Sequence, residues 1–224
     1  MTRTNLPHFA RLRCPDCGTV FPAEVMESTG SGGAVESDLC YHGSGTFAYP
    51  YFIAVCPGCR SAAYIRDYEY LGEMPPYSPY DPIGQWLAAF IKEQRQLFPG
   101  TLKYEMAARA YINRGAPALT VAYLYLRGSW CARHSNDRGA ERRCQTEALR
   151  WFEEALAQGF ATEVEAAIVT YLIAELNRRL GRFEEAIAWF KRMPASVPSW
   201  LARGVREMRD LAEQGIASPC LLPR

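Results

Sequence analysis

Two Cys-x-x-Cys pairs place the strongest constraint on this chain. They read Cys14-Pro-Asp-Cys17 and Cys56-Pro-Gly-Cys59, and 38 residues separate them. Two cysteines in a tight turn can direct both sulfurs at one point about 2.3 Å from a zinc ion. A second such turn completes a tetrahedral set of four thiolates, which leaves no position for water or substrate. The pattern therefore predicts one structural Zn²⁺ bound by these four cysteines.

The residues around the pairs refine this prediction. Gly18 follows the first pair and permits positive φ, whereas Arg60 holds the matching position after the second pair, where positive φ costs strain. The 38-residue separation exceeds the 15–20 residues or so of a compact zinc site. We therefore expect the glycine- and serine-rich stretch 28–45 to be an inserted flexible loop.

Other cysteine chemistry stays open. The four cysteines could be reduced and metal-free, whereas a redox role is disfavoured because neither pair opens a helix within a βαβ unit. Cys40 and His42 lie in the inserted stretch and could replace a ligand or join a second metal, although loop residues are the simpler interpretation. Cys131 and His134 are three positions apart on a predicted helix, a spacing that would suit a nucleophile and base or two metal ligands. Cys144 is the one candidate for a third ligand, and packing is the expected role of these residues.

The chain changes character near its first third. Short strands are expected over 19–26, 46–56 and 62–70, and four prolines then interrupt 72–82. Beyond them, apolar residues recur with helical period, and we expect helices over 83–98, 101–114, 117–134, 139–158, 163–180, 182–193 and 199–214. The predicted fold class is α+β: a zinc-ribbon-like domain (1–71), a proline-rich linker (72–82) and an all-α helical-hairpin domain (83–224).

Two of the expected helices are similar to each other. Residues 147–152 and 185–190 align with an offset of 38, and 181–190 resembles the turn and second helix of a tetratricopeptide repeat. Small alanines let paired helices approach, and an aromatic residue one turn later fills the groove. A generic helical bundle is the alternative interpretation.

Composition excludes several classes. The 224 residues carry a net charge of +1, and 49% are hydrophobic, as in ordinary globular proteins. The first residues lack the apolar core of a signal peptide, and the apolar stretch 166–176 is too short to span a bilayer. We expect a cytoplasmic protein without a membrane partner.

A family resemblance rests on several of these segments. The chain resembles an uncharacterised bacterial family, domain of unknown function 2225, at 14–19 with Phe21, at 37–40, at 49–51, at 55–59 and at Ala62-Ala63. The family usually has glycine where this chain has Arg60. The resemblance implies a zinc-ribbon-like start, a repeat-like helical remainder and a role for residues 38–40 beyond filling a loop. It supplies no activity.

A protein-interaction scaffold or adaptor is the leading functional hypothesis, because stacked hairpins present a curved surface. The repeat register would put four residues on its concave side: Tyr171, Glu175, Arg178 and Arg179. The alternative is that Tyr171 packs and the charged side chains solvate a helix.

Nucleic-acid binding is the second hypothesis, and the charge of the ribbon opposes it. Residues 1–70 hold five Lys/Arg against seven Asp/Glu, and a zinc centre with four thiolates adds negative charge. The segment 127–143 is locally basic, with Arg127, Arg133, Arg138, Arg142 and Arg143. These arginines could hold RNA or an acidic protein, with Arg138, Arg142 and Arg143 as the candidate contacts.

An enzyme is the weakest hypothesis. The chain has no phosphate-binding P-loop, no dinucleotide fingerprint and no Gly-x-Ser-x-Gly elbow, and its three histidines are His8, His42 and His134. The sequence thus predicts a non-enzymatic, zinc-stabilised adaptor for a protein partner and leaves the oligomeric state open.

Overall fold

The computed structural model describes residues 6–26, 29–74, 78, 80–160, 162–194 and 197–222. A three-stranded antiparallel sheet of order β2-β1-β7 is formed by β1 (His8–Arg13), β2 (Val20–Val25) and β7 (Glu69–Glu73). Along β1 the side chains alternate, with Ala10 and Leu12 fully buried and Arg11 and Arg13 exposed. One face of this sheet therefore covers a small core.

Two shorter antiparallel pairs accompany the sheet. One pairs β5 (Ile53–Val55) with β6 (Ala62–Tyr64), and the other pairs β3 (Ala34–Val35) with β4 (Tyr41–His42). Two 3₁₀ turns flank β5 and β6, namely η1 (Tyr49–Tyr51) and η2 (Ile65–Asp67). The strand expected over 46–56 is thus a turn followed by a short strand, and the strand at 8–13 was not predicted.

Seven helices follow in the part of the chain that the structure describes. They are α1 (Pro82–Leu97), α2 (Gly100–Asn113), α3 (Ala118–His134), α4 (Arg138–Gln158), α5 (Glu163–Arg179), α6 (Phe183–Lys191) and α7 (Ser199–Glu213). Local chemistry sets several of their starts, since Asp81, Asp137 and Thr162 each accept a hydrogen bond from a backbone N–H of the first turn. The expected helices and the α+β class are confirmed. None of these helices combines the length and apolar character needed to cross a membrane.

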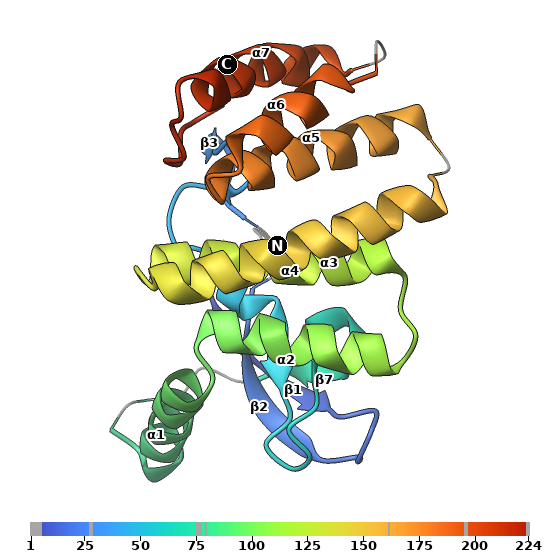
Figure 1. The fold of residues 1–224 in the computed structure, drawn as a ribbon. Coiled ribbons are helices and arrows are strands. Elements are labelled where there is room, and N and C mark those ends of the chain that lie inside the picture. The colour runs from blue at the N-terminus through green and yellow to red at the C-terminus, as the bar shows by residue number, and fades with distance from the viewer. Residues whose placement is uncertain are drawn as a thin grey trace.

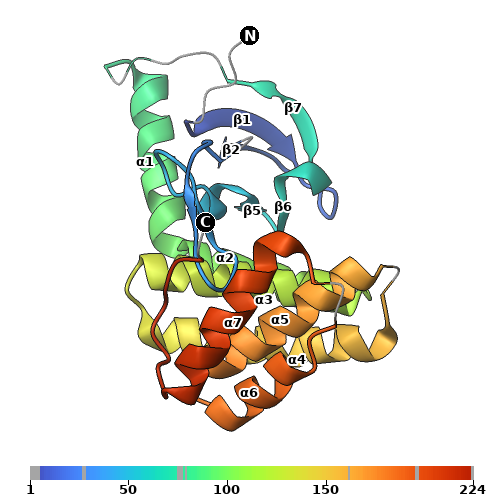
Figure 2. The ribbon, with the colours of Figure 1, turned by 90° about the horizontal axis from the view of Figure 1, so that it is seen from above.

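The helices stack in chain order. From α2 to α7 each helix packs against the next, and Figure 1 shows them as successive layers above the sheet. Figure 2 shows α1 apart from this stack, along one flank of the sheet. The small residues Ala148 and Ala186 are fully buried in the α4 and α6 segments that align in sequence.

The strands and the helices share one hydrophobic core. Its members include Ile53, Val55 and Tyr64 of the strands together with residues of α2–α7. The hydroxyl of Tyr104 in α2 donates to the carbonyl oxygen of Tyr49 at 3.0 Å within this core. The division into segments 1–71, 72–82 and 83–224 stays a prediction: β7 continues to Glu73, and residues 75–77 and 79 of the predicted linker lie outside the described part.

The stretch expected to be a flexible loop contains a hairpin that is partly buried, over the residues from 29 onward that are described. Residues 34–42 form the β3–β4 hairpin, whose connection holds three buried side chains: Ser37, Asp38 and Cys40. Backbone hydrogen bonds join this hairpin to the last described residues, from Ser37 to Cys220 and from Leu222 to Val35. Figure 1 accordingly shows β3 beside α5 and not beside the sheet.

Candidate metal centre

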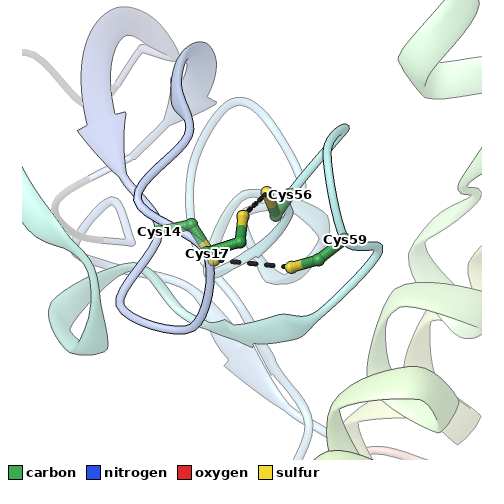
Figure 3. Close-up of side chains that lie close together, drawn as sticks. All are labelled: Cys14, Cys17, Cys56 and Cys59. Carbon is green, nitrogen blue, oxygen red and sulfur yellow. Dashed lines mark hydrogen bonds between the residues drawn. The ribbon is translucent and has the colours of Figure 1, made fainter.

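Two matching turns carry the four cysteines. Cys14 and Cys17 lie in the turn between β1 and β2, and Cys56 and Cys59 lie in the turn between β5 and β6. Figure 3 shows the four side chains converging from these two turns. The turns thus come from different sheets and meet at their tips.

The backbone of both turns is closed in the same way. The N–H of Gly18 donates to the Cys14 carbonyl at 2.9 Å, and the N–H of Arg60 donates to the Cys56 carbonyl at 2.8 Å. Gly18 has a φ of +74° and Arg60 a φ of +61°. Both are left-handed conformations, so Arg60 adopts the backbone strain that the sequence predicts for a side chain at this position.

The sulfur atoms have the spacing of a tetrahedral ligand set. The Sγ atoms of Cys14 and Cys59 are 3.7 Å apart, those of Cys17 and Cys56 are 3.6 Å apart, and all four lie within 4.8 Å of one another. Four sulfurs about 2.3 Å from a central zinc ion would be about 3.8 Å apart. The four cysteines therefore form a cluster that could hold a metal ion.

The cysteines differ in exposure and in acidity. Cys14 and Cys56 are buried, whereas Cys17 and Cys59 are exposed. Cys17 Sγ and Thr19 Oγ1 are joined by a 3.2 Å hydrogen bond, and this contact lowers the pKa of Cys17 to about 6. Burial raises the pKa of Cys14. One thiolate thus forms readily at neutral pH, whereas a cation would have to displace the proton of Cys14.

Comparison with known proteins assigns the family. A family model described as "Uncharacterized protein conserved in bacteria (DUF2225)" matches residues 10–212. The chain belongs to this family. No curated protein and no solved structure matches it. The family resemblance found in the sequence is therefore confirmed, and the match to the DUF2225 family spans both the strands and the helices.

Within this DUF2225 chain, the segment 36–40 is held by arginines of the helices. Arg133 of α3 contacts Glu36 and Asp38, and it also donates to Glu141 of α4 at 2.8 Å. Arg179 of α5 lies 3.6 Å from Asp38 and donates to Glu141 at 2.7 Å. Sequence reasoning missed this ion-pair network, although the similarity to the family at 37–40 pointed to the segment.

The four residues expected on a concave partner surface are buried. Tyr171, Glu175 and Arg178 are 0% exposed and Arg179 is 9% exposed. Tyr171 donates through its hydroxyl to the Ser37 carbonyl at 2.7 Å. Residues of the same chain therefore cover these four side chains, and a partner-binding role for them stays a prediction.

The Arg178 guanidinium shows what occupies that surface. It donates to both carboxylate oxygens of Glu175, at 2.8 and 2.6 Å, and to the carbonyl oxygens of Ile216 and Ser218. Residues 216–222 and the β3–β4 hairpin together cover the concave surface on which the repeat register predicts a partner.

The second possible ligand group is already engaged. Glu36, Cys40 and His42 have their ligand atoms within 4.8 Å of one another. However, the Arg133 guanidinium pairs with Glu36, and burial raises the pKa of the Cys40 thiol well above its usual range. A buried thiol next to a paired carboxylate and a guanidinium is a poor cation site.

The remaining candidates lie in three different settings. Cys131 is buried, with its Sγ against Gly100, and the ring of His134 stacks on Phe47 with centroids 4.1 Å apart. Cys144 Sγ lies 3.7 Å from a Glu105 carboxylate oxygen. These three residues do not form a common site.

The basic segment 127–143 is not one surface. Arg138, Arg142 and Arg143 are exposed on α4, whereas Arg127 and Arg133 are half-buried against other residues of the chain. Glu105 and Glu147 lie in the same surface cleft as Arg142 and Arg143.

Proposed function

We propose that Cys14, Cys17, Cys56 and Cys59 bind one structural Zn²⁺. The spacing of their four sulfurs is the observation that carries this proposal. Sulfur-only tetrahedral sites suit zinc, and a complete set of four thiolates leaves no open position for catalysis. The role of the ion is therefore structural.

The ion would join two small sheets. The core under the sheet is formed by few large side chains, with Leu12, Phe21 and Tyr68 the bulkiest of its buried members. So small a core contributes little stability, and structural zinc sites commonly supply folding free energy in such cases. The cation would fix the β1–β2 turn against the β5–β6 turn.

We further propose that the zinc-stabilised chain is a scaffold or adaptor for a protein partner, on helices of tetratricopeptide-like repeat character. The stacking of α2 to α7 in chain order supports this interpretation. With the expected concave surface covered, the exposed apolar side chains of α1 supply the alternative surface. Ile83, Trp86 and Leu97 are 69%, 56% and 53% exposed.

A nucleic-acid-associated factor is the second candidate. The exposed positions of Arg138, Arg142 and Arg143 on α4 favour it. The acidic side chains of Glu105 and Glu147 beside them oppose it, since they reduce the local positive potential.

Elemental analysis of the purified, reduced protein tests the metal site. We expect about one zinc per chain, and loss of the metal in Cys14→Ser and Cys59→Ser. Cys220→Ser is the matched control, because Cys220 lies outside the cluster and should leave the stoichiometry unchanged. Wild-type protein without bound metal, or with a full complement after either cluster substitution, would contradict the proposal.

A pull-down with the full-length chain tests the adaptor role. Tagged wild type is compared with Ile83→Glu/Trp86→Glu and with Arg138→Glu/Arg142→Glu, before and after nuclease treatment. We expect protein partners to survive nuclease and to be lost only with the α1 variant. Capture that disappears with nuclease or with the α4 variant would favour nucleic acid instead.

A further inference from the structure

A cleft of about 530 Å³ opens between the strands and the helical stack. None of the four cysteines lines it, and its wall combines aromatic rings with nitrogen-bearing side chains from β1, β6, β7, η2 and α3. The lining residues that matter here are His8, Phe52, Tyr64, Arg66, Tyr70 and Arg127. Neither aspartate nor glutamate is among the described residues that line it.

Arg127 is the central feature of the cleft. Its side chain is half-buried, donates to the Tyr64 hydroxyl and lies over the rings of Tyr64 and Tyr123, with Cζ 5.5 and 5.8 Å from their centroids. Within the described ranges of the chain, no carboxylate forms an ion pair with it. A guanidinium cannot neutralise by losing its proton, so its partial burial without a counter-charge is costly. An anion entering the cleft would remove that cost.

Two further groups face the same space. The Arg66 guanidinium lies 4.9 Å from the Tyr64 ring centroid, so two guanidinium groups contact the same ring. The Arg66 side chain is 79% exposed, and its neighbouring carboxylate, Asp67, is 4.0 Å away. His8 Nε2 is buried and has no hydrogen-bond partner within the part of the chain that the structure describes. The cleft therefore offers two guanidinium groups, of which Arg127 is half-buried and Arg66 has Asp67 beside it, and one imidazole nitrogen without a partner among the described residues.

The apolar part of the wall indicates that the ligand also carries an apolar group. Phe52 and Tyr70 accompany Tyr64, and aliphatic side chains of β2 and η2 complete the lining. The volume lies in the usual range of about 300–1,000 Å³ for small-molecule sites. Guanidinium pairs recognise phosphate by charge-assisted, often bidentate hydrogen bonds.

We propose that this cleft binds an aromatic phosphate monoester of about mononucleotide size. The phosphate lies between Arg66 and Arg127, within reach of the His8 imidazole, and the ring packs on the aromatic wall. Two guanidinium groups complement the two negative charges of a phosphate monoester better than they complement the single negative charge of a carboxylate.

Isothermal titration of the full-length, metal-loaded chain tests the site. The probe is 1-naphthyl phosphate, compared with inorganic phosphate and with uncharged 1-naphthol. We expect one probe per chain, bound about tenfold or more tightly than either fragment, because both halves of the site contribute. No binding of the probe at millimolar concentration, or equal affinity for 1-naphthol, would overturn the proposal.

Substitutions assign the contacts. Arg127→Met keeps the aliphatic stem and removes the charge, and we expect about a tenfold or greater loss of probe affinity. Arg206→Met is the matched control, since Arg206 is exposed on α7 outside the cleft. Unchanged affinity of Arg127→Met for the probe would contradict the assignment of Arg127 as a phosphate contact.

A second variant and a chemical readout guard against misfolding of Arg127→Met. Arg66→Gln alters an exposed side chain and should weaken the probe severalfold while leaving the fold intact. Independently, phenylglyoxal labelling of wild-type Arg66 and Arg127, read by mass spectrometry, should fall in the presence of the probe while Arg206 stays labelled. Equal labelling with and without the probe would contradict the site.

Discussion

Arg133 of α3 donates two hydrogen bonds to the carboxylate of Asp38, at 2.9 and 3.1 Å, across 95 positions of sequence. The Asp38 side chain is fully buried, and that of Arg133 is 14% exposed. This bidentate pair fastens the β3–β4 hairpin to the helical stack. The hairpin is therefore a structural link between the two halves of the chain.

Removing the Asp38 carboxylate should destabilise the whole fold. Asp38→Ala removes a fully buried carboxylate, while Arg133 keeps Glu36 and Glu141 as partners, so we expect the free energy of unfolding to fall by about 1–3 kcal/mol. Urea denaturation followed by circular dichroism measures the change. Asp210→Ala, at an exposed position on α7, is the control and should stay within about 0.5 kcal/mol of wild type. A loss below about 1 kcal/mol in Asp38→Ala would show that the pair does not secure the hairpin.

The positive φ angles in the two cysteine turns predict that Gly18→Ala and Arg60→Gly change the free energy of unfolding in opposite directions. A Cβ added to Gly18 would meet nothing within 4 Å, so Gly18→Ala tests the backbone alone. With φ at +74°, we expect it to lower the free energy of unfolding by about 1–2 kcal/mol. Arg60→Gly relieves the same strain at φ +61° and should raise the free energy of unfolding by about 1 kcal/mol. Both are measured on metal-loaded protein by denaturant unfolding, and destabilisation by Arg60→Gly would refute the strain argument.

Lys103 predicts a specific pH dependence of stability. Its ammonium group is half-buried in α2 and donates to the Pro50 carbonyl at 3.1 Å, and burial lowers its pKa from 10.5 to about 8. Between these two pH values the unfolded chain binds more protons than the folded chain. The free energy of unfolding contributed by this group therefore rises with pH from 8 to 10.5, by up to about 3 kcal/mol, and is constant below pH 8.

Comparison with a variant isolates this contribution from those of the other titratable groups. The difference in unfolding free energy between wild type and Lys103→Met should increase in favour of wild type as the pH rises from 8 to 10.5. Lys92→Met, at an exposed position of α1, should follow the wild-type profile. Parallel profiles for wild type and Lys103→Met would rule out a buried charge at this position.

Local patterns determined much of this structure. The four cysteines come together as their spacing predicts, because each tight turn fixes two sulfurs and only one further contact has to bring the turns together. The helices begin and end near the predicted residues, because caps such as Asp137 and breakers such as Gly181 act within a few positions of themselves. The match to the DUF2225 family rests on the same short segments.

Only the tertiary structure decided what the predicted partner surface contains. The repeat register places Tyr171 and Arg178 on a concave face, and the sequence has no signal that residues 36–40 and 216–222 return to cover it. Likewise, Asp38 meets Arg133, and Arg127 is left facing a cleft without a carboxylate, through contacts between residues distant in sequence. Such contacts depend on how the whole chain packs, whereas the cysteine turns and helix ends depend on neighbours a few residues away.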